Sequence, residues 1–516
     1  MAFLRNIATV GGLTLVSRVL GFLRDILIAA FLGAGPIADA FFVAFKLPNF
    51  FRRLFAEGAF SAAFIPIFSG ELAQHGRERA MAFAAQASSV LLWVLLGLVL
   101  LFEIAMPWFM YVLAPGFAED QEKFTLAVDF SRITFPYILF ISLVSLQGGV
   151  LNTLDRFAAM AATPILLNLC LITALVGFAQ AAATPGHALA WGVAAAGVVQ
   201  LVWLMAALRR EGVVLRLPRP RLTTEIRRLL TLFFPVALGA GVYQVNLVID
   251  VIIASLLPTG SISFLYYADR VNQLPLGVVG IAVGTALLPL LSRQVKNGEG
   301  EAALESQNRA IEYALFFALP AAAALMTLSL PVVTVLFERG AFSAADALAT
   351  ARALAAFAIG LPAYVLVKVL VPGYFAREDT RTPIQIGVVA MMLNVVLSLI
   401  LMAFLAHVGL ALATATSAWF NAVMLAQGLK KRGHLAMDAQ LCRRVARMLL
   451  CSAVLAVALV FLAGGLAGPL AGTQAMRFAA LAALVAAGLV LYGGLAQATG
   501  AARLDALWRS HGRELG

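Results

Sequence analysis

Residues 36–72 read PIADAFFVAFKLPNFFRRLFAEGAFSAAFIPIFSGEL, a stretch long and apolar enough to cross a membrane. It nevertheless carries Asp39, Lys46, Arg52, Arg53 and Glu57 along its length, with Pro48 in its middle. A charged side chain at bilayer depth costs roughly 2.5–3.5 kcal/mol, so a chain does not place several there for packing alone. We therefore expect this segment to line a polar cavity inside a membrane protein.

The composition of the whole chain indicates the same class. Of 516 residues, 62% are hydrophobic and only 12% are charged, with a mean hydropathy of +0.94. Soluble domains carry about 25% charged residues. We predict an all-α polytopic membrane protein. The N-terminus begins like a signal peptide, but Arg18 interrupts its apolar run and no cleavage site follows, so we expect a retained first helix.

Hydropathy divides the chain into segments of about 20 apolar residues each, the length of one transmembrane helix. Fourteen such segments are expected, and the second and eighth contain charges and prolines that blur their ends. The predicted spans are 8–32, 37–70, 82–112, 124–152, 158–181, 186–209, 226–256, 261–293, 308–337, 346–375, 383–405, 408–429, 446–468 and 475–498.

Basic residues gather in the loops on one side of these spans. The densest group lies at 209–228, and others follow at 293–296, 377–381 and 430–447. Both predicted ends of the chain fall on this side, so the positive-inside rule predicts that both termini are cytoplasmic. The net charge of +11 therefore faces anionic lipid and does not indicate nucleic-acid binding.

An internal repeat appears at an offset of about 220 residues. Equivalent residues recur in the same order along both halves, which predicts two parallel six-helix repeats followed by two further helices. We expect an N-terminal lobe at 1–215, a second lobe at 216–435 and the extra helices at 436–516. The matching pairs are Pro66 with Pro289, Pro107 with Pro331, Gly116 with Gly340, Pro136 with Pro362, Asn168 with Asn394, and Gln200 with Asn421.

The first two predicted helices hold the strongest cluster of charges. Their five basic side chains outnumber three acidic ones. A surplus of arginine, whose planar fork suits phosphate oxygens, indicates an anionic ligand of charge near −2, such as a diphosphate. The alternative is that the charges pair with each other and only lock helices together. The cluster consists of Arg18, Arg24, Lys46, Arg52 and Arg53 with Asp25, Asp39 and Glu57.

Helical periodicity gives these side chains different directions. At 100° per residue, Arg18 and Asp25 share a face and Arg24 points about 120° away. In the second helix the regular stripe includes Arg53 and excludes Arg52, although Pro48 disturbs the phase beyond it. Pattern alone therefore favours Arg53 as the cavity-facing residue.

Further polar residues lie in the second half, and none forms a recognisable catalytic motif. Asp269, Arg270 and Lys368 stand within predicted spans, while Asp250 and Asn394 are weak candidates for a cation site. The three cysteines lack ligand spacing, and no phosphate-binding loop or metalloprotease motif occurs. We predict a transporter with no cofactor and no firm metal site.

Several stretches resemble a known family. They are SRVLGFLRD (17–25), DAFFVAFKLPNFFRRLFAEGAFSAAFIPIFS (39–69), APGF (114–117), FPYILFISL (135–143), YYADR (266–270) and KVLVPGYFAREDTRTP (368–383). They are similar to the bacterial MurJ, or MviN, family of lipid II flippases, within the multidrug/oligosaccharidyl-lipid/polysaccharide exporter superfamily. The resemblance implies two six-helix lobes in a V, plus two C-terminal helices that form a groove for a lipid tail.

The resemblance also assigns residues. The family's cavity arginines match Arg18, Arg24, Arg52 and Arg270, which favours Arg52 where the helical pattern favours Arg53. Polar positions of the family match Asp25, Asp39, Glu57 and Lys368, with Lys46, Arg53 and Asp269 as further cavity candidates. Some members hold sodium in the second lobe, and Asn394 fits that site, whereas Ser398 stands where a carboxylate would strengthen it.

The function implied is transfer of lipid II (undecaprenyl-diphosphate-MurNAc-pentapeptide-GlcNAc) across the inner membrane by alternating access. Its partners would be this lipid, membrane lipids and cell-wall synthesis proteins. Three alternatives stay open: a flippase for another undecaprenyl-diphosphate glycan, a drug or cation antiporter of the MATE type, and a non-transporting scaffold. An antiporter would need an acidic, aromatic cavity, in contrast to the basic one expected here.

Overall fold

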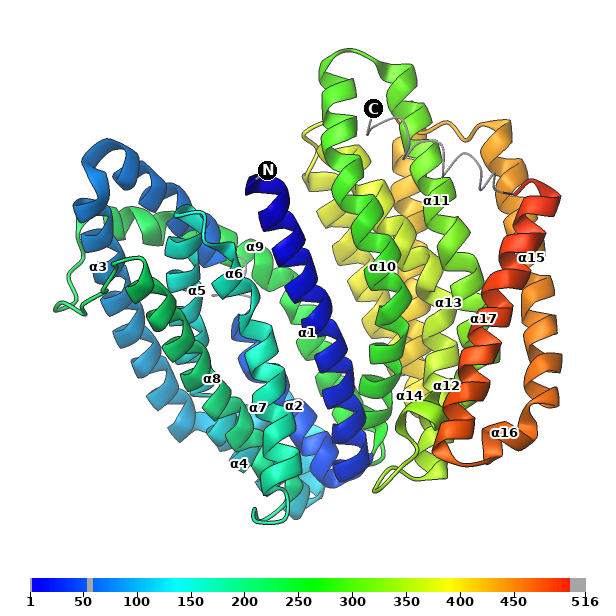
Figure 1. Ribbon diagram of the computed structural model, residues 1–516, viewed down its shortest axis with the longest axis horizontal. Coiled ribbons are helices and arrows are strands. Elements are labelled where there is room, and N and C mark those ends of the chain that lie inside the picture. The colour runs from blue at the N-terminus through cyan, green and yellow to red at the C-terminus, as the bar shows by residue number, and fades with distance from the viewer. Residues whose placement is uncertain (1, 53–58, 502–516) are drawn as a thin grey trace. The chain divides into compact units, whose positions relative to one another are not determined.

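The computed structural model describes residues 2–52 and 59–501, with side chains described outside 2–7, 51, 59, 236–247 and 278–286. Every regular element in these ranges is a helix, as Figure 1 shows, which confirms the all-α prediction. The chain divides into two compact units: Met1–Ser263 with Arg339–Phe342, and Phe264–Glu338 with Ser343–Gly516.

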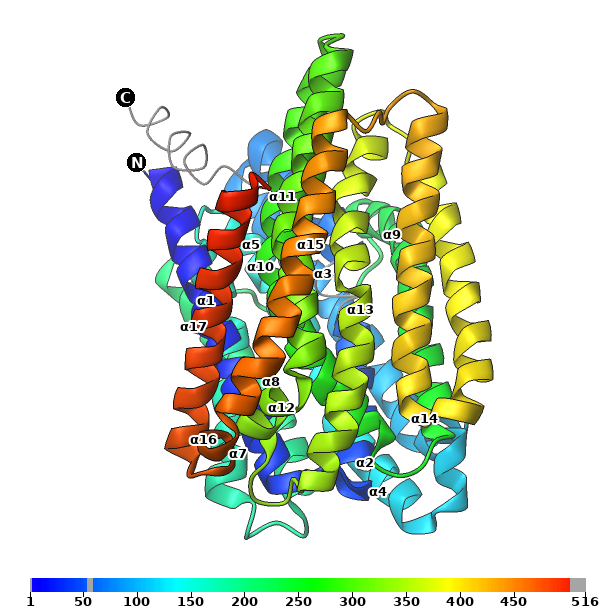
Figure 2. The same cartoon turned by 90° about the vertical axis from the view of Figure 1, so that its right-hand side faces the viewer.

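The first unit is a bundle in which α3 packs against α5 and α9, α2 against α4, and α7 against α1 and α8. Figure 2 gives a second view of the same helices. The elements are α1 (Ala2–Leu32), α2 (Pro36–Phe51), α3 (Ala59–Leu113), the 3₁₀ turn η2 (Pro115–Glu119), α4 (Gln121–Thr134), α5 (Tyr137–Thr153), α6 (Phe157–Ala161), α7 (Thr163–Phe178), α8 (Pro185–Arg210) and α9 (Thr224–Ser255).

The second unit is built around α11 and α13, with α14 packed on α13 and α15 on α11. Its elements are α10, whose first turn belongs to the first unit, and the helices that follow it. They are α10 (Ser261–Lys296), α11 (Gly300–Thr327), α12 (Ser329–Phe337), α13 (Ala344–Phe375), α14 (Arg381–Lys431), α15 (Ala439–Gly465), α16 (Ala467–Ala471) and α17 (Gln474–Thr499).

Two of these helices contain a break at which the chain changes direction. In α3 the break lies at Gly76, with φ 81° and ψ 179°. In α14 it lies at Ala406, with φ 46° and ψ −130°. Nine of the described helices, or pairs of joined helices, are long and apolar enough to cross a membrane. The chain is thus a polytopic membrane protein, and the exact number of fourteen spans stays a prediction.

Side chains that accept hydrogen bonds from the backbone start several helices. Ser343 forms a capping box with Asp346 at the start of α13, and Asp438 accepts from the backbone N–H of Leu441 at the start of α15. Such caps satisfy amides that have no partner within the helix. The polar residues between predicted spans therefore fix where the long apolar helices begin.

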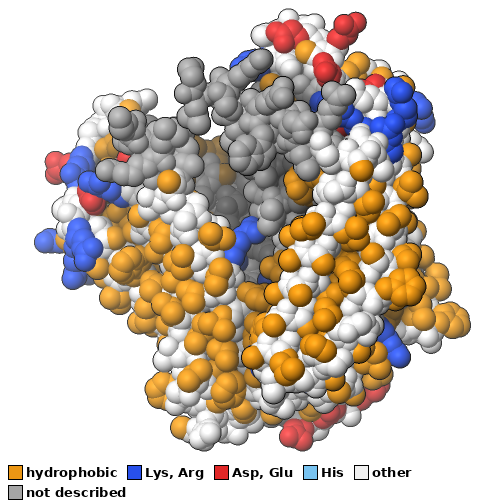
Figure 3. All heavy atoms as spheres, turned by 45° about the vertical axis from the view of Figure 1, so that its right-hand side comes forward, with side chains coloured by type: hydrophobic (Ala, Val, Ile, Leu, Met, Phe, Trp, Pro, Cys, Tyr) orange, Lys and Arg blue, Asp and Glu red, His pale blue; other side chains and the backbone are white. Residues whose placement is uncertain are grey.

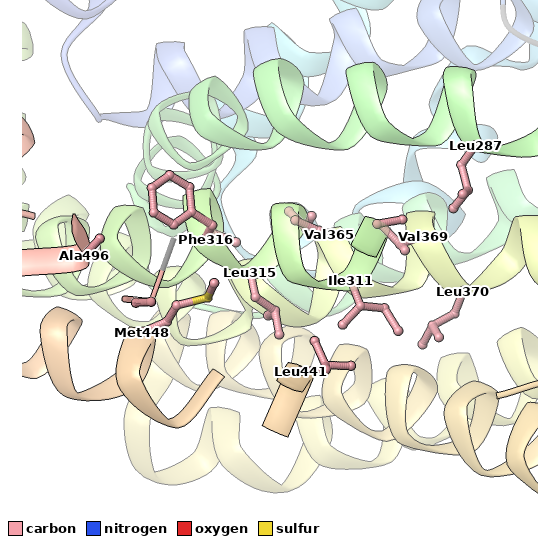
Figure 4. Close-up of a cluster of buried hydrophobic side chains, with 14 of the residues drawn as sticks. Leu287, Ile311, Leu315, Phe316, Val365, Val369, Leu370, Leu441, Met448 and Ala496 are labelled. Carbon is pink, nitrogen blue, oxygen red and sulfur yellow. The ribbon is translucent and has the colours of Figure 1, made fainter. Parts of the chain in front are cut away.

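The core of the second unit lies between α11, α13, α15 and α17. Figure 4 shows Leu315 and Phe316 of α11 beside Met448 of α15, with Val365 of α13 close by. The outer faces of α15 and α17 are apolar too, since Phe461 is 76% exposed and Val490 is 76% exposed. On the face shown in Figure 3, apolar side chains cover the lengths of the helices and most charged ones lie near their ends, with one basic group at mid-height, as in a protein surrounded by lipid.

Two glycines of the first unit allow close approach of backbone segments. A Cβ on Gly340, where φ is +59°, would lie 2.2 Å from the carbonyl oxygen of Ala30 at the end of α1. A Cβ on Gly116 would lie 2.1 Å from the carbonyl oxygen of Ser255 at the end of α9. Neither separation is possible for real atoms, so only glycine fits at these positions.

Candidate functional site: the charged cluster of the first two helices

Arg24 and Asp25 form a buried ion pair on α1, with only 7% and 3% of each residue exposed. The Nε and Nη2 atoms of Arg24 donate to Oδ1 of Asp25 over 3.0 and 2.7 Å. Its Nη1 donates to Oδ1 of Asn168 on α7 over 2.9 Å. The guanidinium is therefore held in a fixed orientation by two side chains from two helices.

Asn168 reaches α1 because the facing residue is small. Its Nδ2 donates to the carbonyl oxygen of Ser17 over 2.9 Å, and a Cβ on Gly21 would lie 3.4 Å from that same nitrogen. Sequence reasoning noted Asn168 only as the repeat mate of Asn394 and missed its contact with Arg24. The available signal was an amide side chain at the centre of an otherwise apolar span.

Arg18 lies on α1 well before this pair and is exposed. The expected arrangement placed Arg18 and Asp25 on one face, with Arg24 pointing away. In the structure Arg24 pairs with its neighbour Asp25, because a long arginine side chain can reach the carboxylate of the next residue. The helical projection gives the direction of Cα–Cβ bonds and does not describe where a side chain of seven non-hydrogen atoms ends.

On α2 the candidate residues have different environments. Lys46 is exposed, and Arg52, just past the helix end at Phe51, is half-buried and donates from Nε to Oδ1 of Asn49 over 3.3 Å. The second predicted span, 37–70, contains α2 and the start of α3 at Ala59, and its residues 53–58 lie outside the described residues. Arg53 and Glu57 lie outside the described residues, so the choice between Arg52 and Arg53 stays a prediction.

Asp39, at the first turn of α2, is 1% exposed and fully engaged. Its Oδ2 accepts from the backbone N–H of Gly260 over 2.7 Å and lies 3.2 Å from Nζ of Lys123. Its Oδ1 accepts from the N–H and the hydroxyl of Ser263 over 3.0 and 2.7 Å. These contacts anchor the first turn of α10 to α2 and α4.

Lys123 is a second residue that sequence reasoning missed. It stands in the first turn of α4, close to the acidic Glu119, Asp120 and Glu122, yet it is 3% exposed. Besides Asp39 it contacts the ring of Phe117, whose centroid lies 4.2 Å from Nζ. The negative charge of Asp39 is thus matched by Lys123 and does not offset the arginines of α1 and α2.

Four of the remaining candidates, Asp269, Arg270, Lys368 and Asn394, lie in the second unit. Arg270 of α10 lies over the ring of Tyr266, with Cζ 4.7 Å from the centroid, and the neighbouring Asp269 accepts a hydrogen bond from Gln273. Lys368 on α13 is exposed, whereas Asn394 on α14 is 3% exposed. Asp250, the other cation-site candidate, lies half-buried on α9 of the first unit.

Comparison with known proteins decides the family. The sequence model described as "Lipid II flippase MurJ" matches residues 28–471. The chain belongs to the MurJ lipid II flippase family. It is 45% identical over 517 residues to the "Probable lipid II flippase MurJ" of Rhizobium meliloti (strain 1021), covering 99% of this chain and 96% of that relative.

Solved structures agree with this assignment. A structure titled "Lipid II flippase MurJ, inward closed conformation" superposes with a TM-score of 0.79 at 25% identity, over 95% of this chain and 98% of that one. An inward-facing multidrug resistance MATE family transporter of the MOP superfamily superposes with a TM-score of 0.68 at 13% identity, over 81% of this chain and 94% of that one. The second likeness shows a shared fold only. The MurJ resemblance expected from the sequence is confirmed, and these relatives are named as flippases, that is, as transporters.

Proposed function

We propose that this chain transfers lipid II from the cytoplasmic to the periplasmic leaflet of the inner membrane by alternating access. Membership of the MurJ family supports the substrate. The basic loops predict that both termini face the cytoplasm. An additional partner class, cell-wall synthesis proteins, would act at the surface and is not needed for transfer itself.

The observation that carries the binding step is the buried Arg24, oriented by Asp25 and Asn168. A guanidinium held in place before the ligand arrives loses little entropy on binding, and its charge acts strongly in a low dielectric. Because Asp39 is neutralised by Lys123, the remaining charge of α1 and α2 favours an anion. We propose that Arg18, Arg24, Arg52 and Arg270 bind the diphosphate, with Lys46, Arg53, Glu57, Asp269 and Lys368 as supporting polar residues.

We further propose that fourteen spans form two parallel six-helix repeats, at 1–215 and 216–435. Two contacts in the first unit support the repeat. Gly340 approaches Ala30 and Gly116 approaches Ser255, and both the glycines and their partners are separated by the repeat offset, at 224 and 225 residues. One kind of contact, a glycine turn against the last residues of a helix, therefore recurs at equivalent positions.

The last helices, in residues 436–516, are proposed to hold the polyprenyl tail. They carry large exposed apolar side chains along their spans, among them Val457 at 58%, Phe461 at 76% and Leu489 at 71%. A tail of repeated isoprene units needs apolar surface and no hydrogen-bonding groups. Contact with these helices would leave the diphosphate and its glycan to cross through the polar part of the protein.

The test is replacement of Arg24 by alanine in cells depleted of their own flippase, with periplasmic exposure of lipid II as the readout. We expect exposure to fall to the level of the depleted strain, because the fixed guanidinium is lost. Arg216→Ala, in an exposed basic loop, is the matched control and should retain activity. Both variants must reach the membrane in equal amounts.

Full lipid II exposure with Arg24→Ala would contradict the binding role. Exposure of a different undecaprenyl-diphosphate glycan, with none of lipid II, would favour the other flippase. If alanine at Arg24 and alanine at Arg270 both left the cells growing normally, the result would favour a non-transporting scaffold.

A further inference from the structure

A groove lies in the second unit, where the break of α14 adjoins the first half of α13 and the end of α11. Its volume is about 770 Å³, within the range of about 300–1,000 Å³ that is common for small-ligand sites. On α13 it is lined at positions 352, 355, 356 and 359, a spacing of three and four residues that forms one face of a helix. On α14 it is lined by residues on both sides of the break, between Met402 and Leu412.

The break of α14 is a tight turn that brings its two arms together. At Ala406 the backbone has φ 46° and ψ −130°, a conformation that costs a residue with a Cβ about 1–3 kcal/mol. Three residues later, a Cβ on Gly409 would lie 2.5 Å from the carbonyl oxygen of Leu401, so the second arm starts directly against the first. His407 donates from Nε2 to the carbonyl oxygen of Ala349 over 3.0 Å, which ties the turn to α13. The walls of the groove are therefore held in place by contacts of the protein itself.

Arg352 supplies the charge of the groove, and a ligand can reach it because its side chain is exposed. Within the described part of the chain its guanidinium has no carboxylate or hydrogen-bond partner. Asp346, the acidic residue of α13, lies six positions earlier and so about 120° away around the helix, where it accepts hydrogen bonds from Ser343. Among the residues described by the structure, no acidic side chain lines the groove, so the lining attracts an anion.

Most of the remaining lining is apolar and open. Ile359 and Leu405 are 44% and 43% exposed, and Phe404 is 81% exposed. Met326 and Met402 also line the groove, and unbranched methionine side chains adapt to ligands of irregular shape. A reachable guanidinium beside exposed hydrocarbon is the combination that recognises an amphiphile with an anionic head group.

The groove lies at the end of these helices that is opposite to the basic loops. α13 runs from the groove toward Arg377, and the two arms of α14 run from the break to Arg381 and to Lys431 (Figure 2). Arg352 stands nine residues after the cap Ser343, about 13 Å along the helix axis, between the helix end and its apolar middle. With the orientation proposed above, this is the depth of the lipid head groups in the periplasmic leaflet.

We propose that this groove binds one phospholipid molecule of net charge −1, such as phosphatidylglycerol. The guanidinium of Arg352 donates to the lipid phosphate, and the acyl chains lie along Ile359, Phe404 and Leu405. A zwitterionic head group is disfavoured, because its ammonium meets the positive charge of Arg352 and no carboxylate among the described lining residues. A diphosphate lipid carries at least two negative charges, of which Arg352 balances one.

The experiment is native mass spectrometry of the full-length protein in detergent, titrated separately with phosphatidylglycerol and phosphatidylethanolamine that carry the same acyl chains. We expect phosphatidylglycerol to bind more tightly. Arg352→Gln should weaken phosphatidylglycerol binding about tenfold, the value of one hydrogen bond between charged groups, and leave phosphatidylethanolamine binding unchanged. Arg381→Gln removes the same charge from an exposed position at the far end of α14 and should leave the tightest phosphatidylglycerol site unchanged.

Two further measurements separate the contributions of the head group and the acyl chains. Ala403→Phe fills the groove from an exposed lining position without changing its charge, and it should lower phosphatidylglycerol occupancy. Glycerophosphoglycerol, the same head group without acyl chains, should not bind measurably. Circular dichroism of each variant checks that the helices are intact.

Three results would each overturn the proposal: equal binding of the two lipids, equal behaviour of the Arg352 and Arg381 variants, or binding of the free head group as tight as that of the whole lipid. The readout is binding of a phospholipid, so the outcome is independent of whether the protein transfers lipid II.

Discussion

Replacement of Asp39 by alanine should destabilise the first unit strongly. The carboxylate is 1% exposed and accepts three hydrogen bonds, two from backbone amides of Gly260 and Ser263 and one from the Ser263 hydroxyl. It also pairs with Lys123, which is 3% exposed. The substitution removes the acceptor for all of these groups and leaves a buried ammonium without its carboxylate.

The magnitude follows from the burial of both charges. Removing one partner of a buried ion pair costs about 3–5 kcal/mol, because the other charge is left uncompensated. Lys123→Met should cost less, about 1–3 kcal/mol, since Asp39 keeps its three hydrogen bonds. The Asp39→Ala/Lys123→Met double variant should lose less free energy of unfolding than the two single variants lose together. The difference, the coupling energy, should be about 1–3 kcal/mol.

The measurement is the free energy of unfolding of the purified protein in detergent, from denaturant titrations followed by circular dichroism. Glu122→Gln, an exposed carboxylate beside Lys123 in sequence, is the control and should stay within about 0.5 kcal/mol of the parent. Additive single effects, or an Asp39→Ala variant as stable as the control, would refute this account of the anchor.

Three further predictions concern other parts of the fold. Gly340→Ala should lower the free energy of unfolding by at least about 1–3 kcal/mol, because φ at Gly340 is +59° and the new Cβ would lie 2.2 Å from a carbonyl oxygen. Gly97→Ala, where no atom lies within 4 Å of the new Cβ, is the control and should be neutral or stabilising. Thermal unfolding of the two variants makes the comparison. Glu312→Ala should cost about 3–5 kcal/mol by leaving two arginines short of a partner, measured by denaturant titration; a change below 1 kcal/mol would contradict this. Hydrogen bonds from the backbone N–H of Thr382, and then from the side chains of Thr382 and Arg432, lower the pKa of Asp379 from 3.8 to about 2. The contribution of Asp379 to folding stability is therefore complete above pH 3.8 and disappears as the pH falls to 2. Asp379→Asn should remove this pH dependence of the free energy of unfolding.

The class and family of the protein could be predicted from sequence, because both depend on properties of neighbouring residues, namely their summed hydropathy and their contiguous motifs. Hydropathy over a window identifies apolar helices whatever they pack against. The unusual charges in 36–72, and motifs such as DAFFVAFKLPNFFRRLF, are likewise properties of contiguous residues. For the same reason Arg24 and Asp25 were recognised as candidates from α1 alone.

The partners of those charges could not be predicted in the same way. Asn168 lies 144 residues from Arg24, and Lys123 lies 84 residues from Asp39, so no local pattern connects them. Pro48 lies inside α2 and cannot donate a backbone hydrogen bond there, so helical periodicity gives no reliable direction for the side chains that follow it.

Sequence by itself determined that this chain is a polytopic helical membrane protein of the MurJ family with an excess of arginine in its first two helices. Only the tertiary structure decided which of these charges are already matched. Asp39 serves as an anchor for α10 with Lys123, and Arg24 is oriented by Asp25 and Asn168. The physical reason is that the cost of a buried charge depends on the groups within about 4 Å of it, and packing alone brings those groups together.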